Sequence, residues 1–190
     1  TAAASSSSAG EGADMRLFDA VEAGDLAAAQ AAVAGGASVR AQNGDGEEPL
    51  HCACCEGHLG IAQWLHGAGA SLNATNSLQG QTPLHCACAW SRLGVAQWLH
   101  SAGASVDVTT RDGDTPLHLA CWHGRIEIAQ WLCSAGADAT LKTNAGETPA
   151  QFLQQASLGS RDKQAFNSIM DTLLAAERRG AEERARAAEA

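Results

Sequence analysis

Short apolar segments alternate along this chain with polar breaks that contain glycine. In the clearest stretch, one apolar segment covers residues 117–122 and another covers 126–134. Thr115-Pro116 precedes the first, and this pair suits a helix start because threonine caps free backbone N–H groups and proline fits the first helical position. Gly136 follows the second, where glycine takes a left-handed C-cap. The pattern predicts two short helices, 117–122 and 126–134, joined by a turn.

The same pattern recurs at a constant period. Thr-Pro occurs at 82–83, 115–116 and 148–149, Pro-Leu-His at 49–51, 83–85 and 116–118, Ala-Gln-Trp-Leu at 62–65, 96–99 and 129–132, and Gly-Ala at 36–37, 69–70, 103–104 and 136–137. The offsets are 33 or 34 residues, because the loop 76–81 has one extra residue. A fixed period of this size indicates a repeat architecture.

These motifs, in this order and at this period, resemble the ankyrin repeat family. The fullest copy reads DGDTPLHLAC at 112–121 and continues to Asp138; three repeats match closely within 43–143, and two at the ends are degenerate. The resemblance implies an all-α solenoid of stacked helix-turn-helix units with turns between repeats. Its repeats are expected at 14–42, 43–75, 76–109, 110–142 and 143–179. Degenerate ends are expected because terminal repeats cap such a stack against water.

The two ends of the chain depart from the repeat pattern. Residues 1–13 are low in complexity and are expected to form a flexible tail. A loop is predicted at 156–162, then a helix at 163–178 whose apolar face caps the last repeat; that face comprises Phe166, Ile169, Met170, Leu173 and Leu174. Residues 180–190 form a polar tail in which Glu and Arg lie at helical spacing, so the helix can extend into it.

Charge and cysteine content narrow the function classes. The net charge of −9 and the pI near 5.1 argue against nucleic-acid or anionic-membrane binding, which needs a basic face. The sequence contains no run of 18 apolar residues, so no membrane insertion is expected. Seven cysteines, an odd number in mostly helix-like segments, favour free thiols and a reducing compartment. We expect a cytoplasmic protein; because the chain begins with Ala/Ser-rich sequence after Thr1, an organelle reached after removal of a targeting segment is the alternative.

The stretch 82–90, TPLHCACAW, raises the question of a metal site, a redox site or packing. Cys88 aligns with Cys54 and Cys121 at an inward position, where cysteine behaves as a small hydrophobic residue. Equivalent positions on stacked helices lie ~8–10 Å apart, which is too far for a shared zinc ion or for a disulfide. We therefore predict packing, with no metal and no cofactor. Cys55 is expected to be exposed at a variable position, and a regulatory thiol there is the alternative.

The five tryptophans divide into two sets. Trp64, Trp98 and Trp131 repeat with the period and are interpreted as a packing ladder, with an outer docking stripe as the alternative. Trp90 and Trp122 fall at variable positions that, by the family resemblance, line a concave groove with the turn tips. Tryptophan is frequent among binding hot spots. The predicted partner-binding residues of this groove are Trp90, Trp122, His123, Glu56, Cys55, Asp45, Glu47, Gln79, Gln81, Arg111, Asp112 and Asp114.

The sequence contains no phosphate-binding loop of Walker type, no Gly-x-Ser-x-Gly and no His-Glu-x-x-His, so no enzymatic activity is expected. The leading hypothesis is a scaffold or adaptor that binds a protein segment with basic and apolar residues. The second is a structural accessory subunit built permanently into a larger assembly, in an organelle if the chain is imported. The third, from another class, is a thiol-based redox or metal sensor.

Overall fold

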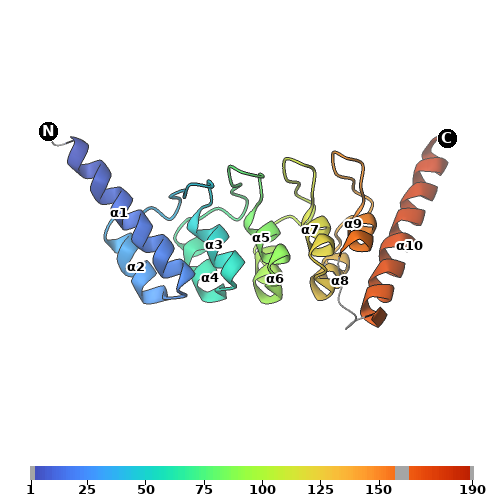
Figure 1. Cartoon of the computed structure of the whole chain (residues 1–190), viewed down its shortest axis with the longest axis horizontal. Helices are drawn as coiled ribbons and strands as arrows, with labels where there is room; N and C mark the ends of the chain where they lie inside the picture. The colour runs from blue at the N-terminus through green and yellow to red at the C-terminus, as the bar shows by residue number, and fades with distance from the viewer. Residues whose placement is uncertain (1–2, 157–162, 189–190) are drawn as a thin grey trace. The chain divides into compact units, whose positions relative to one another are not determined.

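The computed structural model describes residues 3–156 and 163–188 (Figure 1). These residues form helices only and no strand: α1 (Ala3–Glu22), α2 (Leu26–Ala34), α3 (Pro49–Glu56), α4 (Leu59–Gly67), α5 (Pro83–Ala89), α6 (Leu93–Ser101), α7 (Pro116–Trp122), α8 (Ile126–Ser134), α9 (Pro149–Gln155) and α10 (Lys163–Ala188). They divide into two compact units. Unit 1 contains α1–α6 and ends at Ala104, and unit 2 begins at Ser105 and contains α7–α10. The predicted all-α fold of repeated helix pairs is confirmed.

Within each unit, helix pairs pack through the same repeat positions. In unit 1, α3 contacts α1, α4 and α5, and α4 contacts α6. The leucine of the Pro-Leu-His motif and the leucine of the Ala-Gln-Trp-Leu motif are fully buried in every copy, namely Leu50, Leu65, Leu84 and Leu99 in unit 1 and Leu117 and Leu132 in unit 2. Alanines beside them are equally buried, so small residues let the helices approach closely. The 33-residue period is therefore a period of core contacts.

The motif histidine fixes the start of each first helix. The backbone N–H of the capping residue donates to the histidine Nδ1 at 3.1 Å for His51, 3.2 Å for His85 and 3.2 Å for His118. With Nδ1 accepting, the proton lies on Nε2, which points at the backbone of the next repeat: His118 Nε2 donates to Glu147 O at 3.2 Å. Both nitrogens of His51 and His118 are thus engaged by the backbone. This histidine therefore links the start of its own helix to the backbone of the next repeat.

A pH prediction follows from these two histidines. Burial lowers the pKa of His51 and His118 below the ordinary value near 6.5, although hydrogen bonds to backbone carbonyls oppose it. The unfolded chain therefore binds more protons than the folded chain as the pH falls through about 6.5, and stability decreases there by up to about 1.4 kcal/mol per pH unit for each histidine. Denaturant unfolding between pH 8 and 5 should show this loss, and His118→Gln should reduce its slope.

Glycine at the turn tips lets one turn lie against the next. Gly46 has φ 74°, and a Cβ there would collide with the Ser77 side chain and come within 2.6 Å of the Ser77 backbone nitrogen. Gly113 has φ 84°, and a Cβ would lie 2.8 Å from Asn144 N. Neighbouring turns are then joined by backbone bonds, Ser77 N to Asp45 O at 3.0 Å in unit 1 and Asn144 N to Asp112 O at 2.8 Å in unit 2. These bonds place the predicted turn-tip residues in register within each unit.

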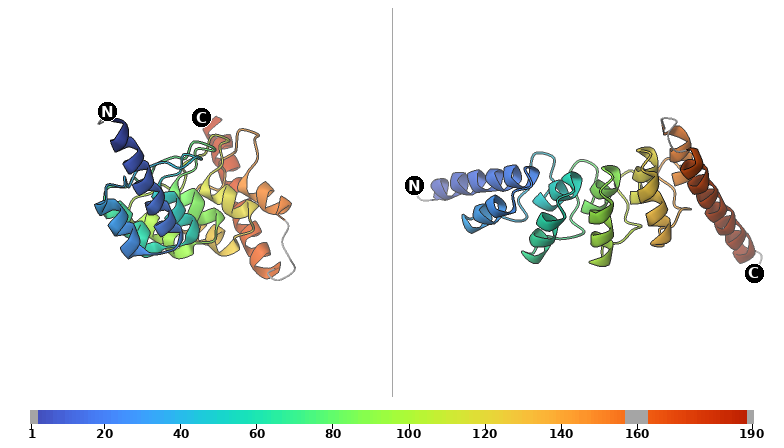
Figure 2. Two further views of the ribbon diagram at one scale, coloured as in Figure 1. Left: turned by 60° about the vertical axis from the view of Figure 1, so that its left-hand side comes forward. Right: turned by 90° about the horizontal axis from the view of Figure 1, so that it is seen from below.

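The first helix departs from the sequence prediction. Residues 3–13, which were expected to form a flexible tail, are the beginning of α1, which runs to Glu22. Its last turns pack against α2 and α3, where Ala13, Leu17 and Val21 are buried (Figures 1 and 2). Alanine has the highest helix propensity, so an Ala-rich segment joined to a packed helix continues that helix instead of leaving it. Low complexity alone was therefore the wrong criterion here.

The last helix confirms the predicted cap and extends beyond it. Helix α10 packs against α8 and α9, and its predicted face supplies buried Ile169, Met170 and Leu173. It continues through residue 180 to Ala188, so the boundary predicted at 179 does not interrupt the helix. The predicted loop 156–162 lies outside the described residues except for Ala156, and the Phe166 side chain is also outside them. Among the described helices, none combines the length and the hydropathy needed to cross a membrane.

Candidate functional site

In unit 2 an exposed tryptophan is held in place by a second ring. Trp122 ends α7 and is 49% exposed. Its ring centroid lies 5.5 Å from that of Phe152 in α9, edge to face at 62°, and Phe152 makes a second such contact, 5.3 Å, with buried His118. Edge-to-face pairs contribute about 0.5–1.5 kcal/mol beyond the area they bury. Trp122 is therefore oriented by the fold while half of its surface faces outward.

Acidic residues occupy the turns of the same unit. Asp112 is exposed at a turn tip, and Asp114 and Glu147 are half-buried. Partial burial raises the pKa of Asp114, and the negative charges of Asp112 and Glu147 act in the same direction, against a hydrogen bond from Thr110. The carboxylates thus repel one another in the free protein. Glu147 Oε1 accepts a hydrogen bond at 3.2 Å from Nε2 of Gln155, which is the last residue of α9, the helix that carries Phe152.

His123 and Arg111, the other predicted residues of unit 2, are both exposed. His123 caps the C-terminus of α7 beside Trp122, and burial together with nearby Arg125 lowers the pKa of its ring. Arg111 belongs to the turn that pairs with Asn144, whose Nδ2 donates to Arg111 O at 2.8 Å. Trp122, Phe152, His123 and the acids Asp112, Asp114 and Glu147 are called the unit 2 patch below.

In unit 1 the predicted residues lie at the ends of α3 and α5 and on two turns. Trp90 follows α5 and is 58% exposed, and Glu56 is the exposed last residue of α3. On the turns, Asp45 and Gln79 are exposed, whereas Glu47 and Gln81 are half-buried. Gln81 Nε2 donates to Gln79 Oε1 at 2.6 Å. Unit 1 thus presents an exposed tryptophan after α5 and acidic and amide side chains on its turns and at the end of α3.

The periodic tryptophans behave differently from these two. Trp64, Trp98 and Trp131 are each half-buried on the second helix of a pair. In unit 1 the ring of His66 packs edge to face against Trp98, with centroids 6.0 Å apart. This contact joins α4 to α6 and supports the interpretation of a packing ladder.

The cysteines follow the predicted packing except at one position. All seven are free thiols, and Cys52, Cys54, Cys86, Cys88 and Cys121 are buried. Burial raises the pKa of Cys52 to about 12, so this thiol stays protonated and inert at neutral pH. Cys55, expected to be exposed, is only half-exposed and lies against Cys86 of the next repeat; hydrogen bonding with Cys55, followed by burial, raises the pKa of Cys86 well above its usual value.

That contact was missed because aligned positions alone were compared. Cys54 and Cys88 are equivalent in the repeat, whereas Cys55 lies in the last turn of α3 and Cys86 lies in the first turn of α5. In unit 2 the same two repeat positions hold Trp122 and Phe152. Phe152 was likewise missed as a site residue, although it occupies the aligned position of Leu119 and the preceding Gln151 replaces the motif histidine, accepting from Thr148 N at 2.8 Å.

Comparison with known families gives two matches. A model of ankyrin repeats in three copies matches residues 17–110, and a second model of ankyrin repeats in many copies matches residues 99–153. The matched residues include helices α2 to α8, most of α9 and nearly all of the candidate surface. A search of curated proteins gave no match.

Proposed function

The chain belongs to the ankyrin repeat family, whose repeats are protein-interaction modules, and from this premise we propose that it is a non-catalytic scaffold or adaptor that binds a partner protein. In each unit, the proposed binding residues lie at the ends of the first helices and on the turn tips, at the positions predicted to line a concave groove. We propose that it functions in a reducing compartment such as the cytoplasm, which is consistent with its free thiols.

The observation that carries this proposal is the exposure of Trp90 and Trp122. Both lie where a repeat needs no large apolar side chain, since the other residues at these two positions are Cys55, Ala89, Gln155, Glu56, His123 and Ala156. Exposed fractions of 58% and 49% leave large apolar areas in water. Tryptophan supplies much contact area at low entropic cost, and Trp122 is already oriented by Phe152.

The charges around the tryptophans indicate the chemistry of the partner. The unit 2 patch carries three acids. Burial, followed by repulsion from Asp112 and Glu147, raises the pKa of Asp114, and a cation bound beside these acids would decrease the repulsion. Asp45, Glu47 and Glu56 add negative charge in unit 1. We therefore propose a partner segment that combines lysine or arginine with apolar residues, the acids setting association rate and salt dependence.

Affinity capture from a native extract, read by mass spectrometry, tests the proposal. The wild-type chain should retain a specific partner at physiological salt, and the double variant W90A/W122A should lose it. Met15→Ala is the matched control, because Met15 is an exposed apolar side chain on α1, 68% exposed, and is not among the predicted partner-binding residues. Equal capture by the double variant and wild type contradicts the proposal. Gel filtration of the extract separates adaptor from permanent subunit, since only an adaptor also elutes free.

A further inference from the structure

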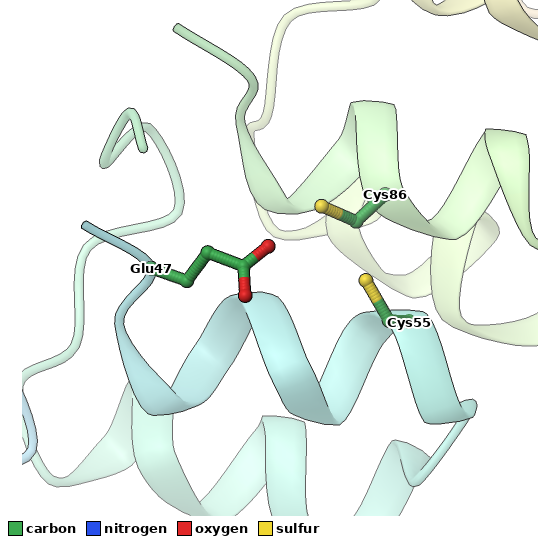
Figure 3. A group of neighbouring side chains, drawn as sticks. All are labelled: Glu47, Cys55 and Cys86. Atoms are coloured by element: carbon green, nitrogen blue, oxygen red, sulfur yellow. The ribbon is translucent and has the colours of Figure 1, made fainter. Parts of the chain in front are cut away.

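Two sulfurs and a carboxylate converge between α3 and α5 in unit 1. Cys55 Sγ, Cys86 Sγ and a carboxylate oxygen of Glu47 all lie within 4.8 Å of one another. Figure 3 shows the three side chains pointing into the same space, Glu47 from the segment before α3, Cys55 from the last turn of α3 and Cys86 from the first turn of α5. Ligand atoms around one zinc ion are about 3.5–3.8 Å apart, given bonds of about 2.3 Å to sulfur and 2.0–2.2 Å to oxygen. Small side-chain movements therefore suffice to bring all three onto one ion.

Neighbouring groups hold two of the three residues in place. Asn43 Nδ2 donates to Glu47 Oε2 at 3.1 Å, and Asn43 Oδ1 accepts from the Glu47 backbone N–H at 2.9 Å. On the other side, Arg92 Nε donates to the backbone oxygen of Cys55 at 2.7 Å, which ties the end of α3 to the repeat that carries Cys86. Such outer contacts orient metal ligands and are common around metal sites.

The two thiols beside Glu47 distinguish this position from its equivalents in the other repeats. The position holds a half-buried polar residue in each of them, Gln81, Asp114 and Glu147, but among the described residues the carboxylate lies beside two thiols at Glu47. At the equivalent positions in unit 2 stand Asp114, Trp122 and Phe152, and the two rings pack against each other. In unit 1 the same repeat geometry brings together donor atoms instead of rings.

We propose that Glu47, Cys55 and Cys86 form a binding site for Zn²⁺ that joins the second repeat to the third. Zinc accepts thiolate and carboxylate ligands together in tetrahedral geometry, and water completes the fourth position. On binding, each thiol transfers its proton to solvent and its sulfur forms a bond to zinc, so no oxidant or reductant takes part. Glu47 and Cys55 also belong to the surface proposed for partner binding, but zinc binding does not require a partner.

The test uses the full chain, stripped of metal and kept in a non-thiol reductant. Titration with Zn²⁺ against a chromophoric chelator should give one tight site per chain, and Co²⁺ should produce the sulfur-to-cobalt charge-transfer absorbance of thiolate ligation. Cys55→Ser, Cys86→Ala and Glu47→Gln should each weaken zinc binding by at least about 10-fold, the lower end of what loss of even an outer-shell contact costs. No partner is needed, so the result is independent of the proposed function.

Matched variants separate this site from other thiols and acids. Cys133→Ser removes a half-buried thiol of unit 2, and Asp45→Asn removes an exposed acid two residues from Glu47; both should bind zinc like wild type. Circular dichroism should show that the Cys55→Ser and Glu47→Gln chains remain helical, and these two decide the result if buried Cys86 does not tolerate substitution. Absence of a tight site in wild type, or undiminished binding by Cys55→Ser and Glu47→Gln, overturns the proposal.

Discussion

Replacing Trp122 by alanine should weaken partner capture by about 30-fold or more, equivalent to about 2 kcal/mol, which is the usual threshold of a binding hot spot. The indole is half exposed and already oriented against Phe152. A partner that covers it gains apolar burial without first having to order the ring. Binding measured by surface plasmon resonance with the captured partner should show the loss mainly as faster dissociation, as expected for the removal of a central anchor.

The fold of this variant should survive. The substitution removes one edge-to-face contact, which contributes about 0.5–1.5 kcal/mol, from a side chain that is half exposed. Trp122→Phe is the matched variant, because it keeps a ring against Phe152 but presents less surface; its affinity should lie between those of alanine and wild type. Full affinity in Trp122→Ala, combined with loss in folded variants of Trp64 or Trp98, would place the binding surface on the opposite side of the repeats.

The repeat period was sufficient to predict most of the fold. Leucine, alanine and histidine recur at positions that must be buried or hydrogen-bonded in every unit, so each copy repeats the same physical requirement. The bounds of α8 followed the prediction at both ends, and α7 began one residue earlier, at Pro116. Proline at the helix start and glycine after the helix end are local requirements that a single sequence reveals.

The ends of the chain were harder to predict because no repeat constrains them. The start of α1 is rich in serine as well as alanine. Composition does not reveal that the last turns of this helix pack against their neighbours through Leu17 and Val21. Helix α10 was predicted from its apolar face, which is a stronger signal than composition. Its continuation to Ala188 depends on exposed Glu and Arg, whose contribution to helix stability is small for each pair.

Candidate site residues were predictable where exposure alone decides their role. Trp90 and Trp122 interrupt a pattern of small and polar residues, so the sequence marked them as surface aromatics. The meeting of Cys55 with Cys86 depends instead on how far the end of one helix lies from the first turn of the next, a distance that alignment of equivalent positions does not contain. Their pairing, and that of Trp122 with Phe152, required the three-dimensional stack.

A chain that ends at residue 160, and therefore lacks α10, should lose the cooperative unfolding of unit 2. Ile169, Met170 and Leu173 are buried against the neighbouring helices, and burial of each contributes about 1.5–3 kcal/mol, an upper estimate of about 5–9 kcal/mol together. Domains of ordinary size are stable by about 5–15 kcal/mol in total. Ala150 and Gln151 of α9 line one cavity together with Leu174 and Glu177 of α10. Loss of α10 opens this side of α9 to solvent.

Urea unfolding followed by tryptophan fluorescence should therefore show the Trp122 and Trp131 signals of unit 2 lost at low denaturant in the shortened chain. Single-tryptophan versions isolate that signal from unit 1. The stability of the full chain with Leu173→Ala should lie between those of the shortened chain and the wild type. This substitution should cost about 2–5 kcal/mol, because it leaves a cavity but keeps the helix. Exposed Arg178→Ala, on the same helix, should change stability by less than about 0.5 kcal/mol. A shortened chain with the midpoint of the full chain would mean that α10 contributes no stability, and that α9 alone ends the stack.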